Sequence, residues 1–257
     1  MVKKIKKSFF KFEEELIEGI IKERKGQFIL FVKVKDKEYL CHCPTTGNIG
    51  GIILKNIPCL LSKSNNPKRK TEYTVEAISL DKINVKSKKW IGINQVKANK
   101  YIEFFLKEGK FNKLIKNVTC LKREQNLGDS KLDFLINNNC YMEVKSPLHY
   151  LNITIPNYIQ VRKKNKLYTG NRLVKHMIEL GKSLKKAQRA IMLLTFQYNS
   201  EKFGQKEKNE KKECIQNVDK IQEAVDEISK LGVEFWQANL SIDKKGVSFL
   251  DHFKIDI

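Results

Sequence analysis

The sequence predicts a two-domain protein in which an all-β barrel at residues 1–94 precedes an α/β domain at residues 95–257. Short strand-like segments separated by turn residues fill the first part. Near Gln95 the spacing of apolar residues becomes helical, and helices and strands then alternate toward the end of the chain. A chain of 257 residues is long enough to bury a core in each of two such domains.

Several short strands are expected in the first domain. Residues 28–35 alternate apolar and polar side chains, and the pattern resumes at residues 38–43 after a turn at Asp36 and Lys37. Turn-rich segments separate the other strands, which we expect at residues 15–24, 57–64, 72–80 and 88–93. Strands of this number and length suit a small barrel of the oligonucleotide-binding (OB) type.

The second domain is predicted to alternate helices with strands. Apolar residues at helical spacing predict a helix that begins near Gln95 and ends at Gly109; they are Val96, Tyr101, Ile102, Phe105 and Leu106. Strands at residues 131–136 and 140–145, joined by three asparagines, predict a β-hairpin. The expected elements that follow are a helix at 172–187, a strand at 189–198, a charged loop at 201–213, a helix at 214–232 and a last strand at 233–242.

The chain is strongly basic, with a net charge of +21. A positive field of this size favours polyanionic partners, and DNA, or alternatively RNA, is the leading candidate. Lysine outnumbers arginine 44 to 6, however, and this ratio is also typical of A-rich codons. Part of the charge therefore has an alternative explanation in coding bias.

The sequence indicates a cytoplasmic protein. No apolar run reaches the 18 residues that a membrane span needs, and the glutamates at residues 13–15 interrupt the apolar part of a signal peptide. The six cysteines are scattered, and Cys41 and Cys43 lack the second pair that a structural zinc site requires. We therefore expect reduced thiols and no membrane partner.

The predicted hairpin brings together residues that could bind a metal ion. Glu143 and Lys145 lie two residues apart on one strand and so share a face, while Asp133 lies on the neighbouring strand. Two carboxylates on adjacent strands can hold Mg²⁺ or Mn²⁺, and the lysine can orient water or neutralise a phosphate. Asp-x(9)-Glu-x-Lys is the sequence form of the PD-(D/E)XK nuclease core. The alternative is a solvated strand with a cross-strand ion pair.

Three further residues are candidates for the same site. Glu124 precedes Asp133 by nine residues, and nuclease cores of this type often carry an additional acid on a preceding helix. Lys175 and His176 lie on the helix after the hairpin, where a basic pair could face a phosphate. Exposed surface positions are the alternative for all three.

Six segments, in order, resemble the sugar fermentation stimulation protein A (SfsA) family. Three lie in the first domain, "HCPTTGNIGG" (42–51), "SNNPKRKTEYTVE" (64–76) and "IGINQVKAN" (91–99). Three lie in the second domain, "LGDSKLDFLI" (127–136), "YMEVK" (141–145) and "KHMIEL" (175–180). Six motifs in the same order are far more specific than any one alone.

The resemblance implies an N-terminal OB barrel, a C-terminal PD-(D/E)XK nuclease-like domain, and DNA binding linked to sugar (maltose) metabolism. It matches Asp133, Glu143 and Lys145 to the nuclease-type triad and Glu124 to the upstream acid. The chain departs from the family pattern at Thr45, Gln95 and Val174, and again after Lys145 through residues 146–170.

A basic turn in the first domain is a candidate nucleic-acid contact. Lys68, Arg69 and Lys70 follow a proline, and three cations on one turn can contact successive phosphates without reading the base sequence. Arg69 is one of only six arginines, so a bias toward lysine codons does not explain it. The alternative is a solvated loop.

The sequence supports two hypotheses of different classes. The first is a regulatory DNA-binding protein, largely independent of base sequence, that retains a nuclease-like metal site. The second is an active Mg²⁺-dependent nuclease. A third alternative, in which the ligand is not nucleic acid, would be favoured by failure to bind DNA at low salt.

Overall fold

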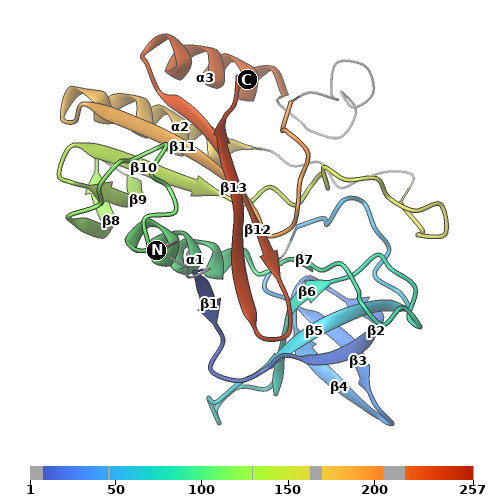
Figure 1. The fold of residues 1–257 in the computed structure, drawn as a ribbon. Coiled ribbons are helices and arrows are strands. Elements are labelled where there is room, and N and C mark those ends of the chain that lie inside the picture. The colour runs from blue at the N-terminus through green and yellow to red at the C-terminus, as the bar shows by residue number, and fades with distance from the viewer. Residues whose placement is uncertain (1–7, 46, 129, 163–169, 205–217, 257) are drawn as a thin grey trace, which may run out of the picture.

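The computed structural model describes residues 8–45, 47–128, 130–162, 170–204 and 218–256, and arranges them around two β-sheets (Figure 1). The smaller sheet contains six strands between residues 17 and 92. The larger sheet contains seven strands, and three α-helices lie in the described part of the chain that accompanies it. The predicted combination of an N-terminal barrel with a C-terminal α/β part is confirmed.

The smaller sheet closes into a barrel of five strands. Its order is β4-β3-β2-β5-β6-β7, and a parallel pairing between β4 and β6 joins the ends, while β7 extends β6 at the edge. The strands are β2 (Ile17–Lys25), β3 (Ile29–Val34), β4 (Lys37–His42), β5 (Ile57–Lys63), β6 (Tyr73–Ile78) and β7 (Ile91–Gly92). Inward residues of these strands, such as Leu30, Val32 and Val75, are fully buried. This alternation is the pattern that predicted the strands.

The larger sheet has the order β1-β13-β12-β11-β10-β9-β8. Its three central strands, β10, β11 and β12, run parallel, and the outer pairings are antiparallel. The strands are β1 (Phe9–Lys11), β8 (Leu121–Leu127), β9 (Ser130–Ile136), β10 (Cys140–Lys145), β11 (Arg189–Phe196), β12 (Glu234–Ile242) and β13 (Gly246–Lys254). The β12–β13 hairpin extends from the α/β part toward the barrel (red in Figure 1).

Helices cover both faces of the larger sheet. Alternate residues of β11 point to opposite faces, so that Ile191 and Leu193 pack with α1 (Ala98–Lys107). Ala190 and Met192 pack instead with α2 (Asn171–Lys182) and α3 (Val218–Lys230). The core on the α1 side also includes Leu60 of the barrel, so the two parts share apolar packing.

Several details differ from the sequence expectations. Strands β1, β8 and β13 were not predicted, and the prediction that residues 233–242 form the last strand is wrong. β13 has no clean alternation because both of its faces are partly covered, and β8 is a largely exposed edge strand. Strand β1 pairs with β13 in the larger sheet rather than with the barrel.

The expected helix boundaries shift in two places. Val96 lies in a single 3₁₀ turn and is 79 % exposed, since α1 begins only at Ala98. Residues 205–217 of the expected charged loop and helix lie outside the described residues, and α3 is described from Val218. In the part of the chain that the structure describes, no helix is long and apolar enough to cross a membrane.

Candidate functional site

Asp133 and Glu143 meet where the β9–β10 ladder ends. The backbone pairing of the two strands ends with Met142 opposite Phe134. Beyond that pair, hydrogen bonds between backbone N–H groups and carboxylate side chains connect the strands. The backbone N–H of Asp133 donates to Glu143 Oε2 at 3.3 Å, and the N–H of Val144 donates to Asp133 Oδ2 at 2.8 Å. Each carboxylate is thus held by the other strand, which fixes the two side by side.

Glu143 is a buried acid with two basic neighbours. Its residue is 1 % exposed, and burying an isolated charge is strongly unfavourable. The Lys145 ammonium donates to Oε1, and Nδ1 of His176 on α2 lies 2.6 Å from the same oxygen. The structure therefore brings His176 into the carboxylate cluster, where it positions Glu143.

Asp133 has a partner that sequence reasoning missed. Asn99, near the start of α1, donates from Nδ2 to Asp133 Oδ1 at 2.6 Å. A signal existed in the sequence, because Asn99 ends the segment at residues 91–99 that resembles the SfsA family. Nothing in that motif indicates that α1 packs on the face of the sheet near β9.

Burial, followed by the neighbouring Glu143 carboxylate, raises the pKa of Asp133 above its usual value. The hydrogen bond from Val144, the charge of Lys145 and the bond from Asn99 act in the opposite direction without reversing it. A cation shared with Glu143 would favour the ionised form of Asp133. The oxygen donors suit a hard divalent ion.

Among the described residues, no group of three or more His, Cys, Asp and Glu side chains is arranged to hold a metal ion. The described protein ligands of an ion at this place would therefore be limited to the two carboxylates of Asp133 and Glu143. Mg²⁺ commonly takes only one or two carboxylates and completes its shell with water and substrate phosphate oxygens. The pair therefore fits an ion of this kind.

Binding of Mn²⁺ or Mg²⁺ at Asp133 is expected to strengthen as the pH rises. A protonated carboxyl is a poor metal ligand, and the raised pKa of Asp133 moves this competition above the ordinary Asp range of about 4. Isothermal titration calorimetry over increasing pH checks this, with Asp133→Asn as the control. An affinity for Mn²⁺ that does not change with pH in the unmodified chain would contradict the assignment.

Without metal, the contribution of Asp133 to folding stability falls as the pH rises, whereas metal binding strengthens. The folded chain holds the Asp133 proton to a higher pH than the unfolded chain does. The stability from this group is fully present below the unfolded pKa and is lost as the pH rises through the folded pKa. Added Mn²⁺ should offset that loss.

Two other predicted site residues, Glu124 and Lys175, have exposed side chains. Glu124 lies on strand β8 rather than on a helix, its side chain is 62 % exposed, and it forms an ion pair with Lys131. Its backbone has a φ of +52°, which interrupts the β8–β9 pairing opposite Asp133. Lys175 is exposed on α2. The described contacts connect neither residue to Glu143.

The basic turn lies between β5 and β6 of the barrel. Lys68 and Lys70 are exposed, as a phosphate contact requires. Arg69 is partly buried, and its guanidinium donates to the hydroxyls of Thr74 at 3.0 Å and Thr71 at 3.2 Å. Arg69 therefore organises the turn, which leaves the two lysines as its exposed cations.

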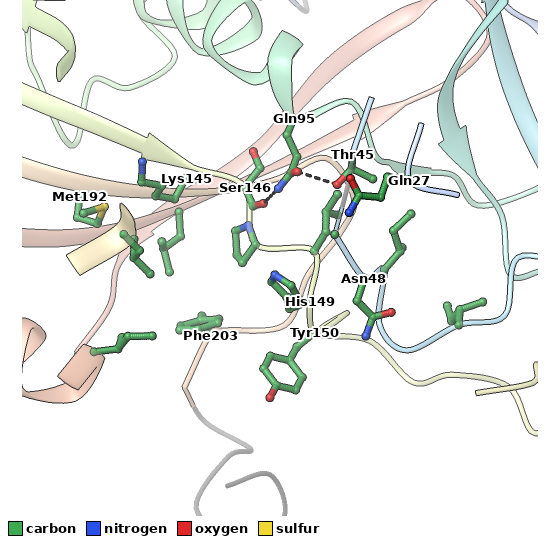
Figure 2. A pocket seen from close by; sticks show the side chains of 18 of the residues that line it. Gln27, Thr45, Asn48, Gln95, Lys145, Ser146, His149, Tyr150, Met192 and Phe203 are labelled. Carbon is green, nitrogen blue, oxygen red and sulfur yellow. Dashed lines mark hydrogen bonds between the residues drawn. The ribbon is translucent and has the colours of Figure 1, made fainter. Parts of the chain in front are cut away.

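A cavity of about 880 Å³ lies between the barrel and the α/β part, and Lys145 is in its wall (Figure 2). Two hydrogen bonds connect residues of its wall: Thr45 Oγ1 donates to Gln95 Oε1 at 2.8 Å, and Gln95 Nε2 donates to the carbonyl of Ser146. Thr45 and Gln95 are two of the departures from the family pattern. The structure places them in direct contact, next to the third departure that begins after Lys145.

Comparison with known proteins finds a family model and relatives to which this chain is similar. Residues 23–93 match the family model for the SfsA N-terminal OB domain. A sugar fermentation stimulation protein homolog of Synechococcus sp. is 32 % identical over 141 residues, which cover 53 % of this chain and 56 % of the relative. The homolog of Saccharophagus degradans is 35 % identical over 142 residues, which cover 53 % and 58 %. The match thus spans about half the length of these curated relatives.

A solved structure has the same fold. The structure of Pyrococcus furiosus SfsA in complex with Ca²⁺ superimposes with a TM-score of 0.69 and covers 97 % of this chain and 99 % of that one. The two sequences are 18 % identical, so the likeness concerns the fold.

Proposed function

We propose that this chain, whose residues 23–93 match the SfsA N-terminal OB domain, is a member of the SfsA family and a nucleic-acid-binding protein with a divalent-cation-dependent nuclease site. Asp133 and Glu143 hold the cation, which is Mg²⁺ or Mn²⁺. The barrel binds DNA or RNA largely through the phosphates. The observation that carries the proposal is the interlocked pair of carboxylates with Lys145 beside it.

The chemistry follows from the residues present. A divalent cation at this position lowers the pKa of a bound water and stabilises negative charge at phosphorus. Lys145 neutralises charge on the phosphate or orients the attacking water, and His176 and Asn99 position the two carboxylates. The Ca²⁺ in the Pyrococcus furiosus SfsA structure supports a divalent-ion site in a protein of the same fold.

Incubation of the purified chain with single- and double-stranded DNA and RNA, with Mg²⁺ or Mn²⁺ and with EDTA, tests the proposal. We expect cleavage that requires the metal. A chain that shifts nucleic acid on a gel but cuts no substrate with either ion would remove the nuclease assignment and leave nucleic-acid binding intact.

The second candidate function is regulation without cleavage. The name of the curated relatives, sugar fermentation stimulation protein homologs, favours a role connected with sugar metabolism. With the basic barrel, this fits a DNA-binding regulator linked to sugar (maltose) metabolism. In this case the carboxylate pair holds a structural or regulatory ion. Binding without cleavage is the result that separates this function from the first.

Replacing Lys68 and Lys70 by Ala is expected to reduce the salt dependence of DNA binding. Each lost phosphate contact lowers the slope of log K against log salt by about 0.9, so the pair should lower it by about 1.8. The loss should be similar for all base sequences. Fluorescence anisotropy at several salt concentrations measures the slope.

Lys35→Ala with Lys37→Ala is the matched control for that experiment. These lysines are exposed at the β3–β4 turn of the same barrel, and their removal changes the net charge equally. An equal slope for both double variants would show that general charge, rather than the turn after β5, determines binding. Arg69 stays unchanged because it stabilises the turn.

A further inference from the structure

The cavity beside Lys145 has the size of a ligand site. Its volume is about 880 Å³, within the roughly 300–1,000 Å³ range of small-molecule pockets. The barrel supplies one wall through the loop that contains Thr45 and Asn48, and α2, α3 and β11 supply the other. Figure 2 shows Lys145 and Phe203 from the α/β part and Thr45 and Asn48 from the barrel around the same space.

The charge of the cavity favours an anionic ligand. The described residues that line it include no Asp or Glu, although the chain contains 29 acidic residues. Three cationic side chains, Arg24, Lys145 and Arg162, line it instead. A cleft lined by one sign of charge attracts a ligand of the opposite sign.

Arg24 is fixed in place at this cavity. Its guanidinium donates to the carbonyls of Gln27 at 2.7 Å, Thr45 at 2.6 Å and Gly47 at 3.0 Å. These three hydrogen bonds hold the barrel loop against the Arg24 side chain. The charge is permanent, because arginine does not lose its proton in proteins. The anion-attracting character is therefore built into the loop rather than supplied by a mobile surface lysine.

Part of the cavity wall is apolar. Met177, Met192, Leu194 and Phe235 line it together with the partly buried ring of Phe203, and Figure 2 shows Met192 beside Lys145. Methionine adapts to flat ligands, and an accessible aromatic ring offers a stacking surface for a base. A ligand that contacts both the cationic and the apolar residues has a negative group next to a flat, largely apolar one, which describes a nucleotide of a nucleic-acid strand.

We propose that this cavity binds an unpaired nucleobase and that the chain takes single-stranded nucleic acid at this site. The inference rests on the proposed function, because Lys145 belongs both to the cavity wall and to the Glu143 site. A base packed against Met192 and Phe203 places its phosphate at Lys145, beside the carboxylates. Bases of a duplex are stacked and paired, so a duplex must open to enter.

Leu173→Trp and Phe203→Ala test the inference. Leu173 is a partly buried cavity residue on α2, so tryptophan there fills the space, whereas Phe203→Ala removes the stacking ring. We expect each variant to bind a fluorescent thymidine oligonucleotide at least about tenfold more weakly in metal-free buffer. Affinity for a blunt hairpin duplex should change less than about twofold. Leu231→Trp, the same substitution at a site 55 % exposed outside the cavity, is the control.

The outcomes separate this inference from the proposed function. Thermal melting shows whether both variants are folded. If both are folded and bind single strands as the unmodified chain does, the cavity assignment is overturned. Metal-dependent cleavage and duplex binding are unaffected by that result. Equal weakening for single strand and duplex would also overturn it. If the unmodified chain binds neither, the proposed function fails as well, and calorimetry with Mn²⁺ then shows whether the metal site survives alone. Should Leu173→Trp not fold, Phe203→Ala decides the question.

Discussion

Glu143→Gln is expected to abolish metal-dependent cleavage, with a rate loss of about a thousandfold or more. The substitution keeps the size of the side chain and removes the negative charge that a divalent ion needs. A bound metal contributes several kcal/mol to the transition state, and about 1.4 kcal/mol corresponds to a tenfold change in rate. The same variant should lose Mn²⁺ binding in calorimetry.

The control for Glu143→Gln is Glu227→Gln, an exposed glutamate on α3. It should cleave within about twofold of the unmodified chain, and its melting temperature should be unchanged. Glu124→Gln should behave like this control, because Glu124 is exposed and pairs with Lys131. Full cleavage by Glu143→Gln would show that another site carries the activity.

Lys145→Met is expected to retain the metal and lose cleavage by about a hundredfold. Methionine keeps much of the side-chain length and apolar stem but removes the ammonium that contacts Glu143. Loss of one group that stabilises developing charge typically costs about 10²–10³ in rate. Removing a cation from Glu143 should also leave Mn²⁺ affinity equal or higher, since the two positive charges compete for one carboxylate.

Lys230→Met, at the exposed end of α3, is the matched control for Lys145→Met. It removes one charge from the same α/β part and should leave cleavage unchanged. A parallel loss of Mn²⁺ binding and cleavage in Lys145→Met would instead show that Lys145 maintains the site's structure. That result would assign Lys145 a positioning role only.

The sequence predicted the parts of the site that lie close together along the chain. Asp133, Glu143 and Lys145 belong to one hairpin, where a period of two determines which side chains share a face. The ladder stops at Met142, and the interlocking hydrogen bonds of the two carboxylates beyond it could not be read from periodicity. The local sequence pattern thus predicted which residues form the site, but not the hydrogen bonds that orient their carboxylates.

Contacts between distant segments were not predictable in the same way. Asn99 meets Asp133 because α1 packs across the sheet, and periodicity shows which face of a helix is apolar without showing where the helix lies. Gln95 and Thr45 were recognised only as separate departures from a family pattern, yet they bond to one another. Strand β13 was missed because it is partly covered on both faces and lacks alternation.

The location of a bound Mn²⁺ ion tests the central claim most directly. Crystals of the unmodified chain grown with Mn²⁺ should show an anomalous difference peak between the carboxylates of Asp133 and Glu143, and crystals of Glu143→Gln should lack it. A Mn²⁺ peak elsewhere with none at this pair, in crystals grown near neutral pH, would contradict the account.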